Sequence, residues 1–154
     1  MQMRVSSYRW LAAVSILAAL ALVPAACGGD DDDDGASATI VNATLASSEG
    51  GEYSIALDRE SVPAGEVTFT LKNEGETEHE FEVVKTDVAA NDLPVEDNKA
   101  DVEASGGEEV DEVEDIEPGA EHDLTVDLES GNYLLICNLP GHYGQGMVTA
   151  FTVE

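Results

Sequence analysis

Apolar and polar residues alternate along most of the chain after residue 38, which is typical of β-strands with one buried face. The clearest example is residues 66–73 (EVTFTLKN), where Val67, Phe69 and Leu71 share one face and polar residues occupy the other. Related patterns cover five further segments: 39–46, 53–58, 79–85, 122–128 and 147–154. Residues 133–137 (YLLIC) are apolar on both faces, as in a central strand of a sandwich. Turn residues separate these segments and no long helical pattern occurs, so the sequence predicts an all-β fold, an antiparallel β-sandwich.

One long internal segment lacks this regular pattern. Residues 86–117 contain 13 acidic residues and only scattered apolar ones. A short helix or an edge strand near residues 109–116 fits the pattern, and neither is preferred. We expect an acidic, solvated insertion that wraps one side of the domain.

The N-terminus has the features of an export signal. Arg4 and Arg9 precede an apolar run at residues 10–23, and small residues end the segment at Ala26. The run is too short for a comfortable membrane span. Residues 1–26 are therefore predicted to be a signal peptide, residues 27–38 an acidic flexible tether, and residues 39–154 one domain.

Cys27 lies where a bacterial lipoprotein carries the cysteine that is lipidated after cleavage. Pro24 departs from the usual sequence before such a cysteine. The alternative is a plain secreted protein cleaved after Ala26. The lipoprotein is favoured because a free exposed thiol outside the cell is a liability. We therefore expect an extracytoplasmic protein, on the bacterial cell surface or in the periplasm, with a lipid anchor at Cys27.

The chain is strongly acidic, with a formal net charge of −27. Loss of Arg4 and Arg9 with the signal leaves four of the six basic residues against all 33 acidic ones, a net charge of −29. Such a surface repels phosphate backbones, so nucleic acid is excluded as a partner. Steering of a basic partner, solubility and adaptation to a salty medium all fit this composition.

Residues 133–154 carry the most specific chemistry. Cys137, His142 and Met147 follow one another with the spacing Cys-x4-His-x4-Met. A thiolate, an imidazole and a thioether are soft to borderline ligands, which suit copper far better than magnesium or calcium. If Cys27 is lipidated, Cys137 is the only cysteine of the exported domain, so no internal disulfide forms. A lone thiol in an oxidising compartment is normally buried or bound to metal.

A fourth ligand is predicted from the phase of residues 79–85 (HEFEVVK). His79 shares a face with Phe81 and Val83, so it points inward if they do. Two histidines, a cysteine and a weak axial methionine make a blue-copper electron-transfer centre. His79, Cys137, His142 and Met147 are therefore the predicted ligands of one copper ion that cycles between Cu(I) and Cu(II). His122 is expected to be exposed and not a ligand.

Three other interpretations of these residues fit less well. A structural zinc site usually has more cysteines and does not recruit methionine. A Cys137–His142 nucleophile pair gives no role to Met147 or His79, and an orienting third residue is not evident. The remaining alternative is a purely structural cysteine–methionine pair in the core. Because no coordination position stays open for a substrate, the chain is not expected to be an enzyme.

The run ICNLPGHYGQGM at residues 136–147 resembles the C-terminal copper loop of the cupredoxin family, with a spacing most similar to that of rusticyanin and sulfocyanin. The resemblance covers residues 39–154 and implies a Greek-key β-sandwich of about seven or eight strands with copper at one end. Family members commonly have Asn or Ser after the first histidine ligand, where it links the two ligand loops. Glu80 occupies that position here, so Asn138, Thr77 or Asn73 is a candidate for the link.

The resemblance also implies how electrons would leave the site. In the family they pass through the exposed edge of the C-terminal histidine ligand within an apolar patch. Leu139, Pro140 and Tyr143 flank His142 and are the expected patch. The expected partner is a redox protein, a cytochrome or a membrane oxidase complex. The alternative function is an extracytoplasmic module that stores copper or delivers it.

Overall fold

The computed structural model describes residues 38–47 and 52–154. The predicted signal peptide, Cys27 and all but the last residue of the predicted tether lie outside the described residues. Within this part of the chain no helix is long and apolar enough to cross a membrane. The described elements are one 3-10 helix, η1 (Tyr143–Gln145), and the strands β1 (Thr39–Ser47), β2 (Tyr53–Leu57), β3 (Ser61–Val62), β4 (Gly65–Asn73), β5 (His79–Lys85), β6 (Val95–Glu96), β7 (Lys99–Ala100), β8 (Glu108–Ile116), β9 (Glu121–Leu128), β10 (Gly131–Ile136) and β11 (Val148–Val153).

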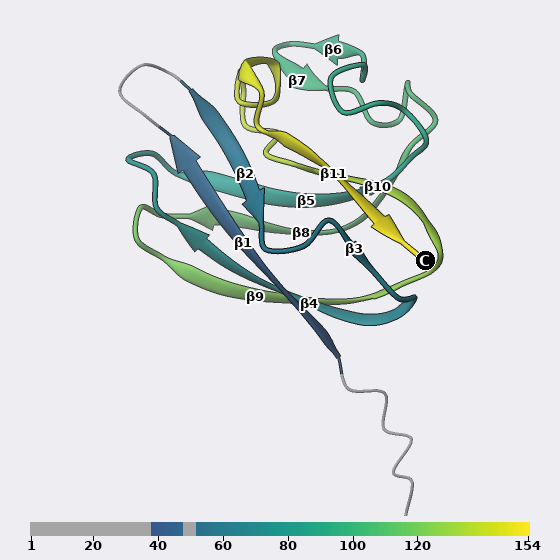
Figure 1. Ribbon diagram of the computed structural model, residues 1–154. Helices are drawn as coiled ribbons and strands as arrows, with labels where there is room; N and C mark the ends of the chain where they lie inside the picture. The colour runs from purple at the N-terminus through teal and green to yellow at the C-terminus, as the bar shows by residue number, and fades with distance from the viewer. Residues whose placement is uncertain (1–37, 48–51) are drawn as a thin grey trace, which may run out of the picture. The chain divides into compact units, whose positions relative to one another are not determined.

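Nine of the eleven described strands form two packed sheets, so the predicted all-β sandwich is confirmed (Figure 1). One sheet has the order β2-β1-β4-β9 and the other the order β3-β11-β10-β5-β8. The sheets are mixed, not purely antiparallel as expected, because β1 pairs with β4 and β3 pairs with β11 in parallel. Alternation reports which face of a strand is buried and carries no information on the direction of its neighbour.

The main core lies between the two sheets and is built from the inward faces predicted by the alternation. Val67, Phe69 and Leu71 of β4 are fully buried. Their aromatic neighbours come from the other sheet: the Phe69 ring lies 5.3 Å from that of Phe81 and 5.4 Å from that of Phe151, between ring centroids. Such offset and edge-on ring contacts stabilise a core by more than the burial of their apolar surface alone provides.

The acidic segment is ordered and covers the outer face of the five-stranded sheet. Its last part is β8, an edge strand paired with β5, while β6 and β7 form a hairpin. Asp97 and Asn98 at the hairpin tip both have positive φ, as a two-residue hairpin turn requires. A second apolar cluster lies under this cover: Val84, Leu93, Ala100, Leu134, Ile136 and Tyr143. The segment is thus less solvated than expected, because its few apolar residues seal the outer face of β5 and β10.

Candidate metal centre

Three strands of the five-stranded sheet bring the predicted ligands to one end of the sandwich. His79 is the first residue of β5, Cys137 directly follows β10, and Met147 directly precedes β11. Because β10 is antiparallel to both neighbours, the start of β5, the end of β10 and the start of β11 meet at the same edge. Pairing of Ile136 with Val148 places Cys137 and Met147 side by side, and the Cys137 amide donates a hydrogen bond to the Met147 carbonyl at 3.1 Å.

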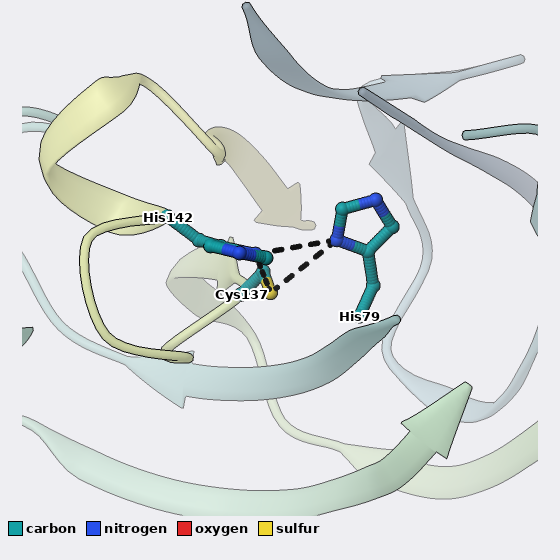
Figure 2. A group of neighbouring side chains, drawn as sticks. All are labelled: His79, Cys137 and His142. Atoms are coloured by element: carbon teal, nitrogen blue, oxygen red, sulfur yellow. Dashed lines mark hydrogen bonds between the residues drawn. The ribbon is translucent and has the colours of Figure 1, made fainter. Parts of the chain in front are cut away.

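Side chains of His79, Cys137 and His142 converge at this edge (Figure 2). The Cys137 Sγ atom lies 3.2 Å from His142 Nδ1 and 3.9 Å from His79 Nδ1. The two Nδ1 atoms lie 3.3 Å apart. His79 and Cys137 are fully buried and His142 is half-buried.

The triangle of donor atoms fits one metal ion. A point equidistant from the three atoms lies about 2 Å from each, which is the length of a metal–imidazole bond and slightly less than a metal–thiolate bond. The other nitrogen of His79, Nε2, is buried and has no hydrogen-bond partner among the described residues. Since only Nδ1 of His79 has polar neighbours, a metal at the centre of the triangle gives this buried ring its main polar contact.

Met147 lies beside this triangle and is fully buried in the same apolar cluster as Cys137. Its amide donates a hydrogen bond to the His142 carbonyl at 3.1 Å. Both backbone groups of Met147 are therefore bonded to residues that carry donor atoms. A thioether with two imidazoles and a thiolate suits copper, whose sites tolerate a long, weak axial ligand.

The loop between Cys137 and Met147 is held by its own backbone. The His142 amide bonds to the Leu139 carbonyl, and η1 follows at once, so His142 turns back over Cys137. Gly146 ends η1 with φ +97°, a conformation that side chains rarely adopt. Glycine at this position thus lets the chain return directly into Met147.

The turn before His79 is built around Asn73, which is fully buried. Its side-chain amide donates to the carbonyls of Thr77 and Ile116, both at 2.8 Å, and its side-chain oxygen accepts from the Gly75 amide at 2.8 Å. A Cβ on Gly75 would lie 2.5 Å from Ser47 Oγ and 3.0 Å from His79 Nε2. Asn73 and Gly75 therefore pack the turn tightly against the His79 ring.

Burial keeps both imidazoles neutral and the thiol protonated in the absence of metal. Desolvation, with the nearby His142, lowers the pKa of His79 to about 4, and desolvation lowers the pKa of His142. Desolvation also raises the pKa of the Cys137 thiol to about 11, although the Glu80 and Leu139 amides oppose the shift. At neutral pH the histidines offer free lone pairs, whereas a metal must displace the Cys137 proton as it binds.

The two ligand segments are joined by a backbone hydrogen bond to sulfur. The Glu80 amide donates to Cys137 Sγ at 3.4 Å. None of the side chains considered for this link provides it. Asn138 pairs with the Ala100 amide and carbonyl, at 2.7 and 3.1 Å, and Thr77 pairs with Ser47. The Glu80 side chain leaves on the opposite face of β5, so its identity does not prevent the link.

Tyr53, the first residue of β2, is a site residue that was not predicted. Its ring stacks on that of His142 with centroids 4.3 Å apart and planes inclined by 29°, and it meets the His79 ring edge-on at 6.0 Å. The sequence contained a signal for the inward direction of this residue, because Tyr53 continues the alternation of Ile55 and Leu57 to the end of its strand. Tyr53 therefore covers both imidazoles from the other sheet.

The expected apolar patch around His142 needs one correction. Tyr143 is buried, not exposed; its hydroxyl donates to the Ala90 carbonyl and accepts from the Leu93 amide, both at 3.0 Å. Pro140 is exposed and Leu139 half-buried, so these two remain beside His142 at the surface. His122 is exposed on β9, as predicted.

Comparisons with known proteins agree with this geometry. A family model described as a cupredoxin-like domain matches residues 14–150, and no curated protein matches the chain. Among solved structures, reduced auracyanin from Roseiflexus castenholzii is 23% identical, with a TM-score of 0.50 over 77% of this chain and 98% of that one. Rusticyanin from Thiobacillus ferrooxidans is 20% identical, with a TM-score of 0.52 over 77% of this chain and 79% of that one. The family and the donor set together support a single copper ion as the cofactor. The chain belongs to the cupredoxin-like family.

Proposed function

We propose that this protein is an electron carrier with a type 1 (blue) copper site, bound by His79, Cys137, His142 and Met147, and held outside the cell membrane by a lipid on Cys27. The observation that carries the proposal is the convergence of the Cys137 sulfur with two imidazole nitrogens at 3.2 and 3.9 Å. A copper ion bound there takes up and releases one electron between its Cu(I) and Cu(II) states.

The protein contributes a frame that holds the donor atoms in one arrangement. His79 and Cys137 extend paired strands, and the backbone of Met147 is bonded to both Cys137 and His142. The Glu80 amide and Tyr53 restrict the sulfur and the two rings further. Since these groups have little freedom to move, little has to reorganise when the electron arrives or leaves.

His142 is the natural exit for the electron. It is the half-buried member of the three residues, whereas His79 and Cys137 have no exposed surface. Pro140 and Leu139 lie beside it. A redox partner, a cytochrome or a membrane oxidase complex, would dock on this apolar surface, with the acidic side chains of the domain steering a basic face of the partner.

Lipid attachment would keep the carrier near a membrane-bound partner. The proposal rests on the position of Cys27 after the predicted signal peptide and before an acidic tether. Replacement of Cys27 by serine should move the protein from the membrane fraction to the soluble fraction of cells. Unchanged membrane association of Cys27→Ser would contradict the anchor and leave the copper site unaffected.

The visible spectrum of the copper-loaded protein tests the copper site. The Cu(II) protein should show the intense absorption of a thiolate–copper bond and should bleach and recover reversibly on reduction and reoxidation. Cys137→Ser should abolish the absorption, whereas Cys27→Ser, which removes the other cysteine of the chain, should retain it. A colourless wild-type Cu(II) protein would refute the blue-copper assignment.

The same samples separate electron transfer from copper storage or delivery. A carrier retains copper through many redox cycles, whereas a delivery module releases Cu(I) readily to a competing chelator. For docking, the transfer rate to a basic cytochrome should fall as ionic strength rises, because salt screens the attraction. A flat response between low and high salt would contradict electrostatic steering.

A further inference from the structure

The acidic segment is bonded to the metal-binding loop, residues 137–147, on both sides of His142. Just before His142, the Gly141 amide donates a hydrogen bond to the Asn98 carbonyl at the tip of the β6–β7 hairpin, at 2.7 Å. Just after it, the hydroxyl of the buried Tyr143 bonds to two backbone groups of the acidic segment, both at 3.0 Å. The hairpin and the turn that contains η1 lie side by side in Figure 1. The same segment therefore holds both neighbours of His142.

Asn138 makes the third connection, directly after Cys137. Its side-chain oxygen accepts from the Ala100 amide at 2.7 Å, and its side-chain nitrogen donates to the Ala100 carbonyl at 3.1 Å. One side-chain amide thus makes the pair of bonds that a residue of an antiparallel neighbouring strand would make. Because Ala100 is buried, water can replace these bonds only in part if the amide is removed.

The ends of the loop and its middle are fixed differently. Cys137 and Met147 bond to each other as extensions of paired strands. His142, midway between them, belongs to no strand, and in the described part of the chain its backbone bonds only to other residues of the loop. The position of His142 therefore depends on the Tyr53 ring on one side and on the anchors to the acidic segment on the other.

We propose that the acidic segment is a clamp on the metal-binding loop, and that Asn138 is the positioning residue that keeps His142 in place when the metal changes its oxidation state. This inference rests on the proposed electron transfer. Thiolate and thioether ligands select Cu(I), whereas imidazole also suits Cu(II). A loosely held His142 should therefore weaken Cu(II) binding more than Cu(I) binding, which raises the reduction potential.

Hydrogen exchange of the copper-free protein tests the clamp itself. Asn138→Ala should speed exchange of the Gly141 amide about tenfold, because two of the bonds that hold the loop to β7 are lost. Asn132→Ala is the matched control. Asn132 lies at the other end of β10, and its side chain also bonds to the acidic segment, at Asp87 Oδ1 over 2.8 Å. In this variant the Gly141 amide should exchange as in the wild type.

The reduction potential separates a positioning role from a purely structural one. Voltammetry of copper-loaded Asn138→Ala should give a potential about 59 mV above that of the wild type, the shift that corresponds to a tenfold preferential loss of Cu(II) for one electron. Asn132→Ala should keep the wild-type potential even where it lowers the thermal midpoint of unfolding, because it leaves the loop and its anchors unchanged.

A second variant protects the test against misfolding. Tyr143→Phe removes only the hydroxyl that bonds to Ala90 and Leu93, and it keeps the ring in its apolar cluster. This substitution releases the anchor on the other side of His142. The exchange rate of the Gly141 amide and the reduction potential should therefore both rise, as they do in Asn138→Ala, but by less.

Two results would overturn the proposal. One is exchange of the Gly141 amide in Asn138→Ala at the wild-type rate, which would show that the acidic segment does not hold the loop. The other is faster exchange with an unchanged or lowered potential in both loop variants, since Asn138 would then stabilise the fold without positioning His142. A colourless wild-type Cu(II) protein would instead refute the electron carrier, and the exchange rates of the copper-free proteins would still decide whether the clamp exists.

Discussion

The two faces of strand β5 are both buried and have opposite chemistry. The inner face carries His79, Phe81 and Val83 into the main core and ends in nitrogen and sulfur donors. The outer face carries Glu80 and Glu82 into an acidic cleft of about 680 Å³ that is lined by nine carboxylates. Alternation along a single strand thus separates soft, neutral metal donors from buried carboxyl groups.

The difference shows how burial acts on the two kinds of donor. On the inner face it removes charge: the imidazole of His79 stays neutral at physiological pH, because its pKa is lowered to about 4. On the outer face burial and the neighbouring carboxylates favour the protonated form, and they raise the pKa of Glu82 to about 7. The backbone of β5 connects the two faces. The Glu80 amide donates a hydrogen bond to Cys137 Sγ on the inner side, while the Glu80 side chain lines the cleft on the outer side. The side chains themselves point to opposite faces, so a substitution of the Glu82 side chain should leave copper binding largely unchanged.

The largest effect is expected from His79→Ala. Loss of one of two imidazole donors should weaken copper binding by more than about 100-fold, since even the partners of metal ligands contribute about 10- to 100-fold. Competition with a chromogenic Cu(I) chelator measures the change. Glu82→Gln serves as the control on the opposite face and should bind copper as the wild type does. Equal weakening by both variants would show that the two faces are not independent.

His79 was predictable because its position follows from the phase of a single strand. The alternation of Phe81 and Val83 fixed its face, and the Cys-x4-His-x4-Met spacing fixed the other three predicted ligands. Tyr53 was harder to predict, because its stack on His142 joins residues from different sheets. A local pattern indicates that such a residue is inward-facing but not what it meets.

The outer face was the part that the sequence described least well. A high density of acidic residues is typical of solvated segments, and residues 86–117 were predicted to be one. The structure places Leu93, Ala100 and Tyr143 in one apolar cluster, and this contact joins the segment to the metal-binding loop. Contacts of that kind depend on residues far apart in the chain, so no periodicity within the segment reveals them.

The second effect concerns pH and Glu82. Its folded pKa, about 7, lies above the ordinary value of 4.5, so the folded protein holds a proton that the unfolded chain releases. Stability should therefore fall as pH rises from about 4.5 to about 7 and level off above it. The full shift corresponds to about 3 kcal/mol, which solvent in the open cleft reduces to about 2 kcal/mol.

Denaturant unfolding over this pH range measures the effect. Glu82→Gln cannot titrate at this position, so it should lose most of the slope and be more stable than the wild type above pH 7. Glu80 and Glu112 face the same cleft, and burial raises the pKa of each, so they leave a smaller residual slope. Asp123→Asn, at an exposed position on β9 in the other sheet, should keep the wild-type profile. If the free energy of unfolding of Glu82→Gln fell with pH as steeply as that of the wild type, the Glu82 carboxyl group would not be the source of the pH dependence.

The smallest effect is expected at the cover of the soft site. Tyr53 stacks on His142 at 4.3 Å and meets His79 edge-on, whereas the acidic cleft has no comparable aromatic cover. Tyr53→Leu should remove about 1 kcal/mol of ring contact and speed copper release to a chelator roughly fivefold. Tyr53→Phe keeps the ring and should release copper as the wild type does. Because the ring and not the hydroxyl makes both contacts, equal rates for the leucine and phenylalanine variants would show that stacking does not restrain His142.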